Sequence, residues 1–131
     1  LSREPIRCAV SIYHPLAAKD HLTVEDLHGE NFLLIRRGWN RYLDQMRDEL
    51  WRDHPQIRIV DFEMFNINVF NQCENSEDIL MTIDNWRQVH PLLKTIPVDW
   101  SYTIPYGLLH SPRPTPTVRR FLKAVRTVYQ L

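Results

Sequence analysis

The sequence is poor in glycine and carries no net charge. Only 3 of its 131 residues are glycine, and neither GxGxxG nor GxxxxGK occurs, which excludes glycine-rich phosphate-binding loops. The 16 Lys and Arg residues balance the 16 Asp and Glu residues. A neutral chain lacks the electrostatic attraction that draws proteins to nucleic acid or to an anionic membrane surface. These residues therefore predict no direct contact with DNA and none with a membrane.

Cysteine is also scarce, and the two that occur form no recognisable motif. Cys8 and Cys73 lie far apart in the sequence and in no CxxC arrangement. We predict two buried, reduced thiols, as is usual in a cytoplasmic protein. A disulfide or a redox sensor is the alternative.

Signals for membrane insertion, metal binding and catalysis are missing as well. No apolar run approaches the roughly 20 residues of a membrane span, and no secretory signal heads the chain. Neither HExxH nor GxSxG occurs. His14, His21 and His28 recur at every seventh position, but Pro15 prevents one continuous helix, so we interpret them as structural or surface residues. We predict no catalytic residue, no metal and no cofactor, and hence a protein that is not an enzyme.

What the sequence does contain is an alternation of strand and helix patterns. With 44% hydrophobic residues, a chain of this length can form one globular domain that buries roughly two-thirds of its unfolded surface. Apolar alternation or short apolar runs predict strands, followed by helical spacing. This order predicts an α/β fold with a mixed, mostly parallel sheet flanked by helices. The predicted strands and extended segments are 6–12, 32–35, 57–63, 79–83, 96–98 and 101–110.

Three helices are predicted between or after these strands. Apolar residues at helical spacing place the first at about 40–53, where His54-Pro55 stops it. Asn66 or Asn68 can cap the second, whose inward face would carry Ile67, Phe70 and Cys73. Thr115 caps the third and Pro116 occupies its first position. The apolar stripe of this last helix comprises Val118, Phe121, Leu122, Val125, Val128 and Tyr129.

A short capped turn links the first two strands. Thr23 and Asp26 have the spacing of a capping box with a short carboxylate. Gly29 supplies the left-handed residue that ends the turn and releases the chain into the strand 32–35.

The order of motifs in this region resembles a known family. A strand ending in HPLA (residues 14–17), a turn reading LTVEDLHGE (residues 22–30) and an FLLI strand (residues 32–35) are similar to the effector-binding domain of LysR-type transcriptional regulators. The resemblance implies a fold like that of type II periplasmic binding proteins, of which this chain would supply one subdomain.

The resemblance also implies a domain organisation. Residues of about 13–100 would form the second regulatory subdomain, with 1–12 and 101–131 as crossover strands and C-terminal helix. The family's helix-turn-helix DNA-binding domain would be absent, and DNA would be contacted only through it. In the family, a small-molecule co-inducer binds between two subdomains and modulates transcription. We therefore expect the effector-sensing part of a cytoplasmic regulator that holds about half of the effector cleft.

Candidate effector-binding residues follow three of the predicted strands. In open α/β sheets, ligands bind beyond the carboxyl ends of strands, near helix N-termini that attract anions. The arginines could pair with a carboxylate of an anionic or polar effector, or could simply be solvated. Trp86 could contact the effector or anchor its loop; Ser11 and Ile12 are weaker candidates. The candidate residues are Arg36, Arg37, Gly38, Trp39, Phe65, Asn66, Asn85 and Trp86.

Other functions and an assembly remain open at this point. A solute-binding module of the periplasmic type II class shares the expected fold, and an α/β enzyme is less favoured. The stripe of the last helix is too apolar to stay in water. We therefore expect it to dock on its own chain or to form a homo-oligomer, such as a dimer that is swapped through this helix.

Overall fold

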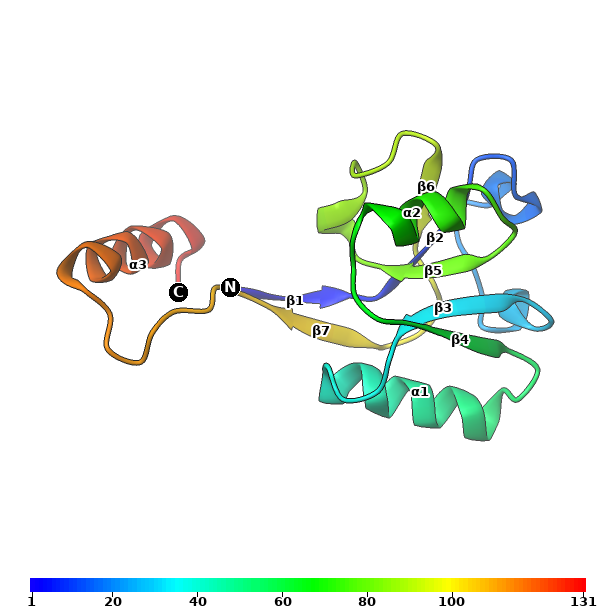
Figure 1. Ribbon diagram of the computed structural model, residues 1–131, viewed down its shortest axis with the longest axis horizontal. Coiled ribbons are helices and arrows are strands. Elements are labelled where there is room, and N and C mark those ends of the chain that lie inside the picture. Colours follow the sequence, from blue (N-terminus) through cyan, green and yellow to red (C-terminus); the bar gives the residue numbers. More distant parts are fainter. The chain divides into compact units, whose positions relative to one another are not determined.

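The computed structural model describes residues 1–131, which divide into two units (Figure 1). The larger unit is Glu4–Ile104, and the smaller unit combines Leu1–Arg3 with Pro105–Leu131. The helices are α1 (Arg41–Asp53), α2 (Ile67–Glu74) and α3 (Pro116–Tyr129). The strands are β1 (Ser2–Pro5), β2 (Arg7–Ser11), β3 (Asn31–Ile35), β4 (Arg58–Phe62), β5 (Ile79–Thr82), β6 (Leu93–Ile96) and β7 (Thr103–Tyr106).

A five-stranded mixed sheet organises the larger unit, in the order β4-β3-β5-β2-β6. β3 pairs in parallel with β4 and with β5. β2 pairs antiparallel with β5 and with β6. The predicted mixed α/β sheet is thus confirmed, and its parallel part consists of β4, β3 and β5. The extended segment predicted at 96–98 begins earlier, at Leu93.

Burial differs between the inner strands and the edge strand, and the sequence reflects the difference. The FLLI run of β3 and the ILMT run of β5 are fully buried, because helices cover both faces of the sheet and leave no face for polar residues. β4 lies at the sheet edge, and only Ile59 and Phe62 are half-buried in it. Its exposed polar residues are typical of a protected edge strand.

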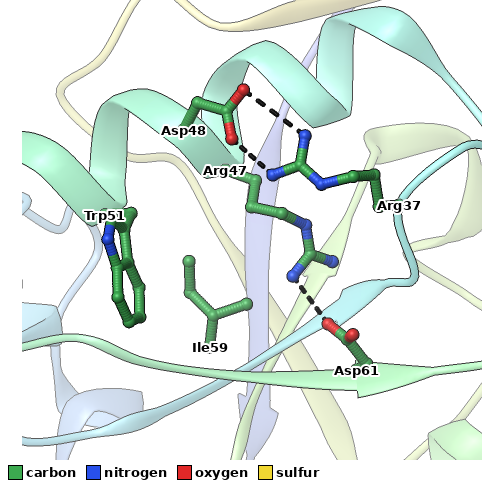
Figure 2. A pocket seen from close by; sticks show the side chains of 6 residues that line it. All are labelled: Arg37, Arg47, Asp48, Trp51, Ile59 and Asp61. Carbon is green, nitrogen blue, oxygen red and sulfur yellow. Dashed lines mark hydrogen bonds and ion pairs between the residues drawn. The ribbon is translucent and has the colours of Figure 1, made fainter.

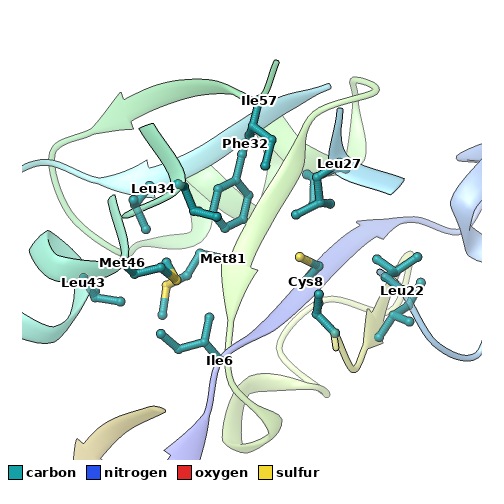
Figure 3. Packing of buried hydrophobic residues seen from close by; sticks show 14 of the residues in the cluster. Ile6, Cys8, Leu22, Leu27, Phe32, Leu34, Leu43, Met46, Ile57 and Met81 are labelled. Atoms are coloured by element: carbon teal, nitrogen blue, oxygen red, sulfur yellow. The ribbon is translucent and has the colours of Figure 1, made fainter. Parts of the chain in front are cut away.

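Helix α1 covers one face of the sheet. Leu43, Met46 and Leu50 are its buried residues, and they join side chains of β2, β3 and β5 in the main hydrophobic core (Figure 3). Asn40 caps the helix by accepting the N–H groups of Tyr42 and Leu43. Full burial of one such aliphatic side chain stabilises the fold by about 1.5–3 kcal/mol, so this row fixes α1 to the sheet.

Helix α2 covers the opposite face. Its buried residues are Val69, Phe70 and Cys73, which pack with Ala9, Leu33 and Leu80 in a second core cluster. The prediction of Phe70 and Cys73 on the inward face is confirmed, but that of Ile67 is wrong, since 54% of its side chain is exposed. Ile67 is the first residue of α2 and lies two positions before Val69. Val69 takes the inward position instead.

The predicted capping box of the turn before β3 is present. The Thr23 N–H donates to the Asp26 carboxylate at 2.9 Å, and the Asp26 N–H donates to Thr23 Oγ1 at 3.3 Å. The turn is a short 3-10 helix, Glu25–Leu27, and Gly29 follows it with φ 82°. The Lys19 ammonium donates to Asp26 at 2.7 Å and, as the largest of several causes, lowers the pKa of that carboxyl group.

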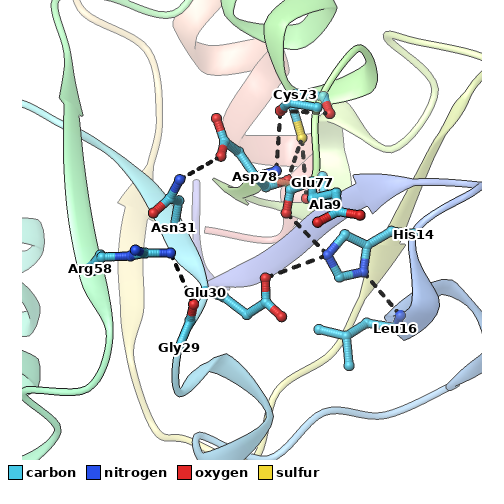
Figure 4. Close-up of polar contacts among 11 residues, drawn as sticks. Ala9, His14, Leu16, Gly29, Glu30, Asn31, Arg58, Cys73, Glu77 and Asp78 are labelled. Atoms are coloured by element: carbon cyan, nitrogen blue, oxygen red, sulfur yellow. Dashed lines mark hydrogen bonds and ion pairs between the residues drawn. The ribbon is translucent and has the colours of Figure 1, made fainter.

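His14 lies at the amino edge of β3 and β5, in a network of polar contacts (Figure 4). Its Nδ1 accepts the Leu16 N–H at 3.0 Å, and its Nε2 faces the Glu77 carbonyl oxygen at 3.0 Å. Because a carbonyl can only accept, Nε2 carries the proton. Buried His14 therefore joins the 3-10 turn Pro15–Ala18 to the loop before β5.

Both cysteines are free and buried, as predicted. Burial raises the pKa of Cys8 far above its ordinary value, and it raises the pKa of Cys73 to about 12. Cys73 Sγ contacts the carbonyl oxygens of Ala9 and Asp78 at 3.4 Å each. These thiols are structural groups of the core.

The smaller unit contains α3, which has the predicted start. Thr115 Oγ1 accepts the Val118 N–H, and Pro116 is the first helical residue. None of its residues is buried: the apolar stripe includes Phe121 at 58% exposure and Val128 at 76%. In no helix of the chain are length and apolar character sufficient for a membrane crossing.

Candidate functional site

Three loops meet at one edge of the sheet because β3, β4 and β5 run parallel. Their carboxyl ends lead into residues 36–40, 63–66 and 83–86, the segments that carry the candidate residues. β2 runs antiparallel and places its first residue, Arg7, opposite Thr82 at this same edge. We call it the carboxyl edge. The sheet thus brings together segments that lie tens of residues apart in sequence.

Aromatic rings occupy the centre of this edge. The Phe65 ring lies 4.8 Å from that of Phe62, edge to face, and 4.7 Å from that of Trp86. Such a pair of rings stabilises the fold by about 0.5–1.5 kcal/mol in addition to the contribution from its buried apolar area. The half-buried Phe65 and Trp86 pack against both core clusters. They hold the ends of β4 and β5 together.

Two neighbouring cavities share Phe65 and Trp86 as walls. One has a volume of about 340 Å³ and is lined by Phe65, Asn66, Ile67, Phe70, Trp86 and Val89; we call it the aromatic groove. The other, about 190 Å³, is lined by Ile35, Trp39, Asn40, Leu43, Phe65, Met81, Trp86 and Ile104. Of the candidates, Trp39, Phe65, Asn66 and Trp86 therefore lie together.

Helix-capping asparagines form the polar part of these cavities. Asn66 Oδ1 accepts the N–H groups of Asn68 and Val69 at 3.0 and 3.3 Å. Asn40 has the same role in α1. Because their carbonyl oxygens are engaged, each retains the side-chain NH₂ as the group that can donate to a ligand.

Arg36 lies at the rim and is already paired. Its Nε is 2.9 Å from the Glu63 carboxylate, and its guanidinium lies 5.8 Å from the centre of the Trp39 ring. Both partners are themselves well exposed, Glu63 at 85% of its side chain. Such an exposed pair contributes little to stability.

Arg37 and Gly38 line neither of these two cavities, and Arg37 instead lines a hollow between α1 and β4. Arg37 forms an ion pair with Asp48 of α1, which raises the arginine pKa and lowers the aspartate pKa. The Gly38 N–H donates to the Asp44 carboxylate at 3.2 Å, and its φ of 99° is the left-handed conformation that favours glycine. Both residues position the start of α1.

The surface between α1 and β4 forms a further hollow of about 610 Å³ (Figure 2). Arg47 crosses it to pair with Asp61 at 2.6 Å and to donate to the Ile35 carbonyl at 2.7 Å. Its buried Nε has no hydrogen-bond partner. Trp51, 74% exposed, and Ile59 form its apolar side. Charged groups here are paired among themselves.

The two candidate residues in the loop after β5 differ in their exposure to solvent. Asn85 is exposed, whereas Trp86 is half-buried. The neighbouring Asp84 pairs with Arg7 at 2.8 Å and holds this loop against the start of β2. Arg7 and Met81 could not be predicted as part of this site, because the direction of β2 and the face of the sheet on which each β5 side chain lies are unknown until the strands are paired.

The weaker candidates Ser11 and Ile12 do not join this site. Ser11 is the last residue of β2, which is antiparallel to β5, and Ile12 follows it. Ser11 lines a separate hollow of about 310 Å³ with His14 and residues 74–77. His21 and His28 have separate partners, Asp99 and His54. No group of three or more His, Cys, Asp or Glu side chains is arranged to hold a metal ion.

Comparisons with known proteins identify the family and the fold. The sequence model described as LysR substrate binding domain matches residues 1–130. Among solved structures, the CcmR regulatory domain of Synechocystis PCC6803 in complex with 2-PG matches with a TM-score of 0.70 at 15% identity, over 96% of this chain and 63% of that one. Curated protein sequences give no match.

Two further structures agree with this result. The effector binding domain of a BenM variant matches with a TM-score of 0.70 at 15% identity, over 99% of this chain and 63% of that one. CbnR, a LysR family transcriptional regulator, gives 0.71 at 14%, over 96% and 45%. The chain therefore spans less than two-thirds of the length of these relatives. Its fold is the type II periplasmic-binding-protein-like fold, and the chain belongs to the LysR substrate binding domain family.

Proposed function

We propose that this chain is the effector-sensing part of a LysR-type transcriptional regulator and that its carboxyl edge forms one wall of the effector cleft. One observation carries the proposal: the three loops with candidate residues converge on a single edge, and two cavities open there between them. Ligands of open α/β sheets bind at such edges. The hollow at the other edge of the sheet, beside His14, holds only the weaker candidate Ser11.

The residues have different roles in this proposal. Phe65 and Trp86 form the shared wall against which the effector packs, and Trp39 and Asn66 extend it on either side. Arg36 lies at the rim. Gly38 and Arg37 support the start of α1, and exposed Asn85 contributes to the mouth.

The regulatory step would be a population shift. An effector held between this edge and a second subdomain favours the arrangement in which both walls contact it. A DNA-binding domain attached to the same regulator then responds to that arrangement, which couples two distant sites. We propose that residues of about 13–100 are the second regulatory subdomain and that the protein acts in the cytoplasm, where its DNA target lies. It performs no catalysis of its own.

We also propose that a second copy of the chain covers the apolar stripe of α3. The side chains of the stripe are half-buried or exposed along the whole helix, and apolar area of this kind is buried in a stable assembly.

A deletion strain tests the proposed function. Removing the gene that encodes this chain should change a small set of transcripts, and their response to one metabolite should be lost. Restoring the gene with Trp86→Asp should not restore that response, whereas restoring it with Trp51→Leu should. Unchanged transcripts, together with export of the protein and binding of a solute outside the cytoplasm, would instead make it a solute-binding module.

A further inference from the structure

This inference rests on the proposed function, because it concerns the chemistry of the ligand at the same edge. The two arginines that follow β3 favour an anionic effector when only the sequence is considered. In the structure, both are engaged: Arg36 with Glu63 and Arg37 with Asp48. The third arginine of this edge, Arg7, pairs with Asp84 at 2.8 Å. Exposed Arg87 lines neither cavity.

The surface that remains at this edge is apolar and largely aromatic. Ile67 is 54% exposed and Val89 is 45% exposed, and with Phe70 they flank the rings of Phe65 and Trp86. These rings are fixed by mutual contact at 4.7 Å and by packing on the sheet. A groove with rigid walls binds a flat guest with little loss of conformational entropy.

The polar atoms of the groove are also largely satisfied. Asn66 Oδ1 is used by the N–H groups of Asn68 and Val69, which leaves one amide NH₂ at the rim. A charge placed in the groove would lose its hydration without gaining an opposite charge. An uncharged ring would instead exchange water for aromatic faces.

We propose that the aromatic groove binds a planar, uncharged ring portion of the effector, stacked between Ile67 and the rings of Phe65 and Trp86. An acceptor atom on the ring edge is met by the Asn66 NH₂. Any ionised group of the effector points away from this subdomain. At about 340 Å³, the groove has the size of a small-ligand pocket.

Two simple probes test the ligand class: indole, which is flat and neutral, and succinate, which is charged and has no ring. The full 131-residue chain is labelled with ¹⁵N, and the indole N–H signals of its four tryptophans are followed during titration. We expect indole to shift the signal of Trp86, the one tryptophan that lines the groove, and to leave the Trp51 and Trp100 signals in place. Succinate should shift none of them.

Two variants make the result specific. Ile67→Glu places a carboxylate on the groove while remaining favourable at a helix N-terminus, so the fold is preserved; it should weaken indole binding about tenfold or more. Trp51→Leu removes an exposed tryptophan that lines the hollow between α1 and β4 and not the groove, and it should leave indole binding within twofold.

Each other outcome overturns the inference. Shifts of Trp86 by succinate and not by indole would keep the proposed effector edge and refute the ligand class. Shifts by neither probe, shifts confined to Trp51, or an unaltered affinity in Ile67→Glu would refute binding of a ring in the groove. Probe-free shifts of Trp86 that grow with protein concentration would assign the groove to a contact between copies. None of these outcomes bears on the transcriptional response, which tests the proposed function separately.

Discussion

Asn66 at the carboxyl edge has a structural role that can be measured independently of ligand binding. Asn66 ends the loop after β4 and satisfies two N–H groups of α2, while its amide faces the aromatic groove. α2 has only 8 residues, too few to be stable without its cap and its packing. The same residue therefore serves the fold and the proposed site.

Replacing Asn66 should destabilise the protein. We expect Asn66→Ala to lower the free energy of unfolding by about 1 kcal/mol, because two N–H groups lose their acceptor. Urea denaturation followed by circular dichroism measures it. Asn68→Ala, an exposed change in the same turn, serves as the control and should cost less than about 0.5 kcal/mol. Equal costs for both variants would contradict the capping role.

Because both thiols are buried, we predict that the stability of the fold decreases at alkaline pH. The pKa of Cys73 is about 12 in the fold against an ordinary 9.0, so below pH 9.0 its contribution is complete. Above it the unfolded chain loses the proton and the folded chain does not, so stability falls by up to about 1.4 kcal/mol per pH unit for each thiol.

Cys73→Ala isolates one of the two thiols. Its unfolding free energy should fall less steeply above pH 9.0 than that of the parent chain. A thiol reagent at neutral pH should modify neither cysteine of the folded protein and both after denaturation. Equal pH slopes, or rapid modification of the native protein, would contradict the burial.

Helices, strands and turns agree closely with the prediction where the local sequence pattern is strong. The capped turn Glu25–Leu27 has both reciprocal hydrogen bonds that its spacing predicts. Helix α1 and the FLLI strand lie within a residue or so of their predicted limits. The inward face of α2 was predicted less accurately at Ile67, because a helix of 8 residues offers too few apolar positions to fix its rotation.

The pair formed by Asp26 and Lys19 gives a test at the level of this turn. The carboxyl pKa is lowered, chiefly by the hydrogen bond from Lys19, so its contribution is present above the unfolded value and is lost as the pH falls through the folded one. Asp26→Asn should reduce stability at neutral pH by less than about 1 kcal/mol.

Acid titration distinguishes the charge from the hydrogen bond. The difference between Asp26→Asn and the parent chain should close on acidification, when Asp26 itself becomes neutral. Glu25→Gln, an exposed neighbour without an ion pair, should leave stability nearly unchanged. A difference that persists undiminished in acid would exclude the charge as its cause.

At the scale of the whole molecule, the sequence predicted the class of fold and the segments of the candidate site, but not their neighbours. The loops after β3, β4 and β5 could be named because polar and aromatic residues follow apolar runs. The pairing of Arg36 with Glu63 and of Arg7 with Asp84 depends on strand order, which no local pattern contains. For that reason we propose an uncharged ring in the aromatic groove, where the sequence alone favours an anionic or polar effector.

The stripe of α3 makes a prediction about assembly. The chain should sediment as a dimer at micromolar concentrations, because burial of side chains such as Phe121 and Val125 offsets the entropy of association. Phe121→Lys should shift the population to monomer, and Arg120→Ala on the polar side of α3 should not. A monodisperse monomer with a solvent-exposed helix would contradict the covered stripe.

Hydrogen exchange in the intact regulator tests the central claim most directly. The regulator that contains this chain is compared with and without the metabolite that alters its transcripts. We predict slower amide exchange in residues 36–40, 63–67 and 84–89, at the carboxyl edge, and unchanged exchange in residues 74–77 at the opposite edge. Protection confined to the opposite edge, or absent from all three loops, would contradict the placement of the effector site.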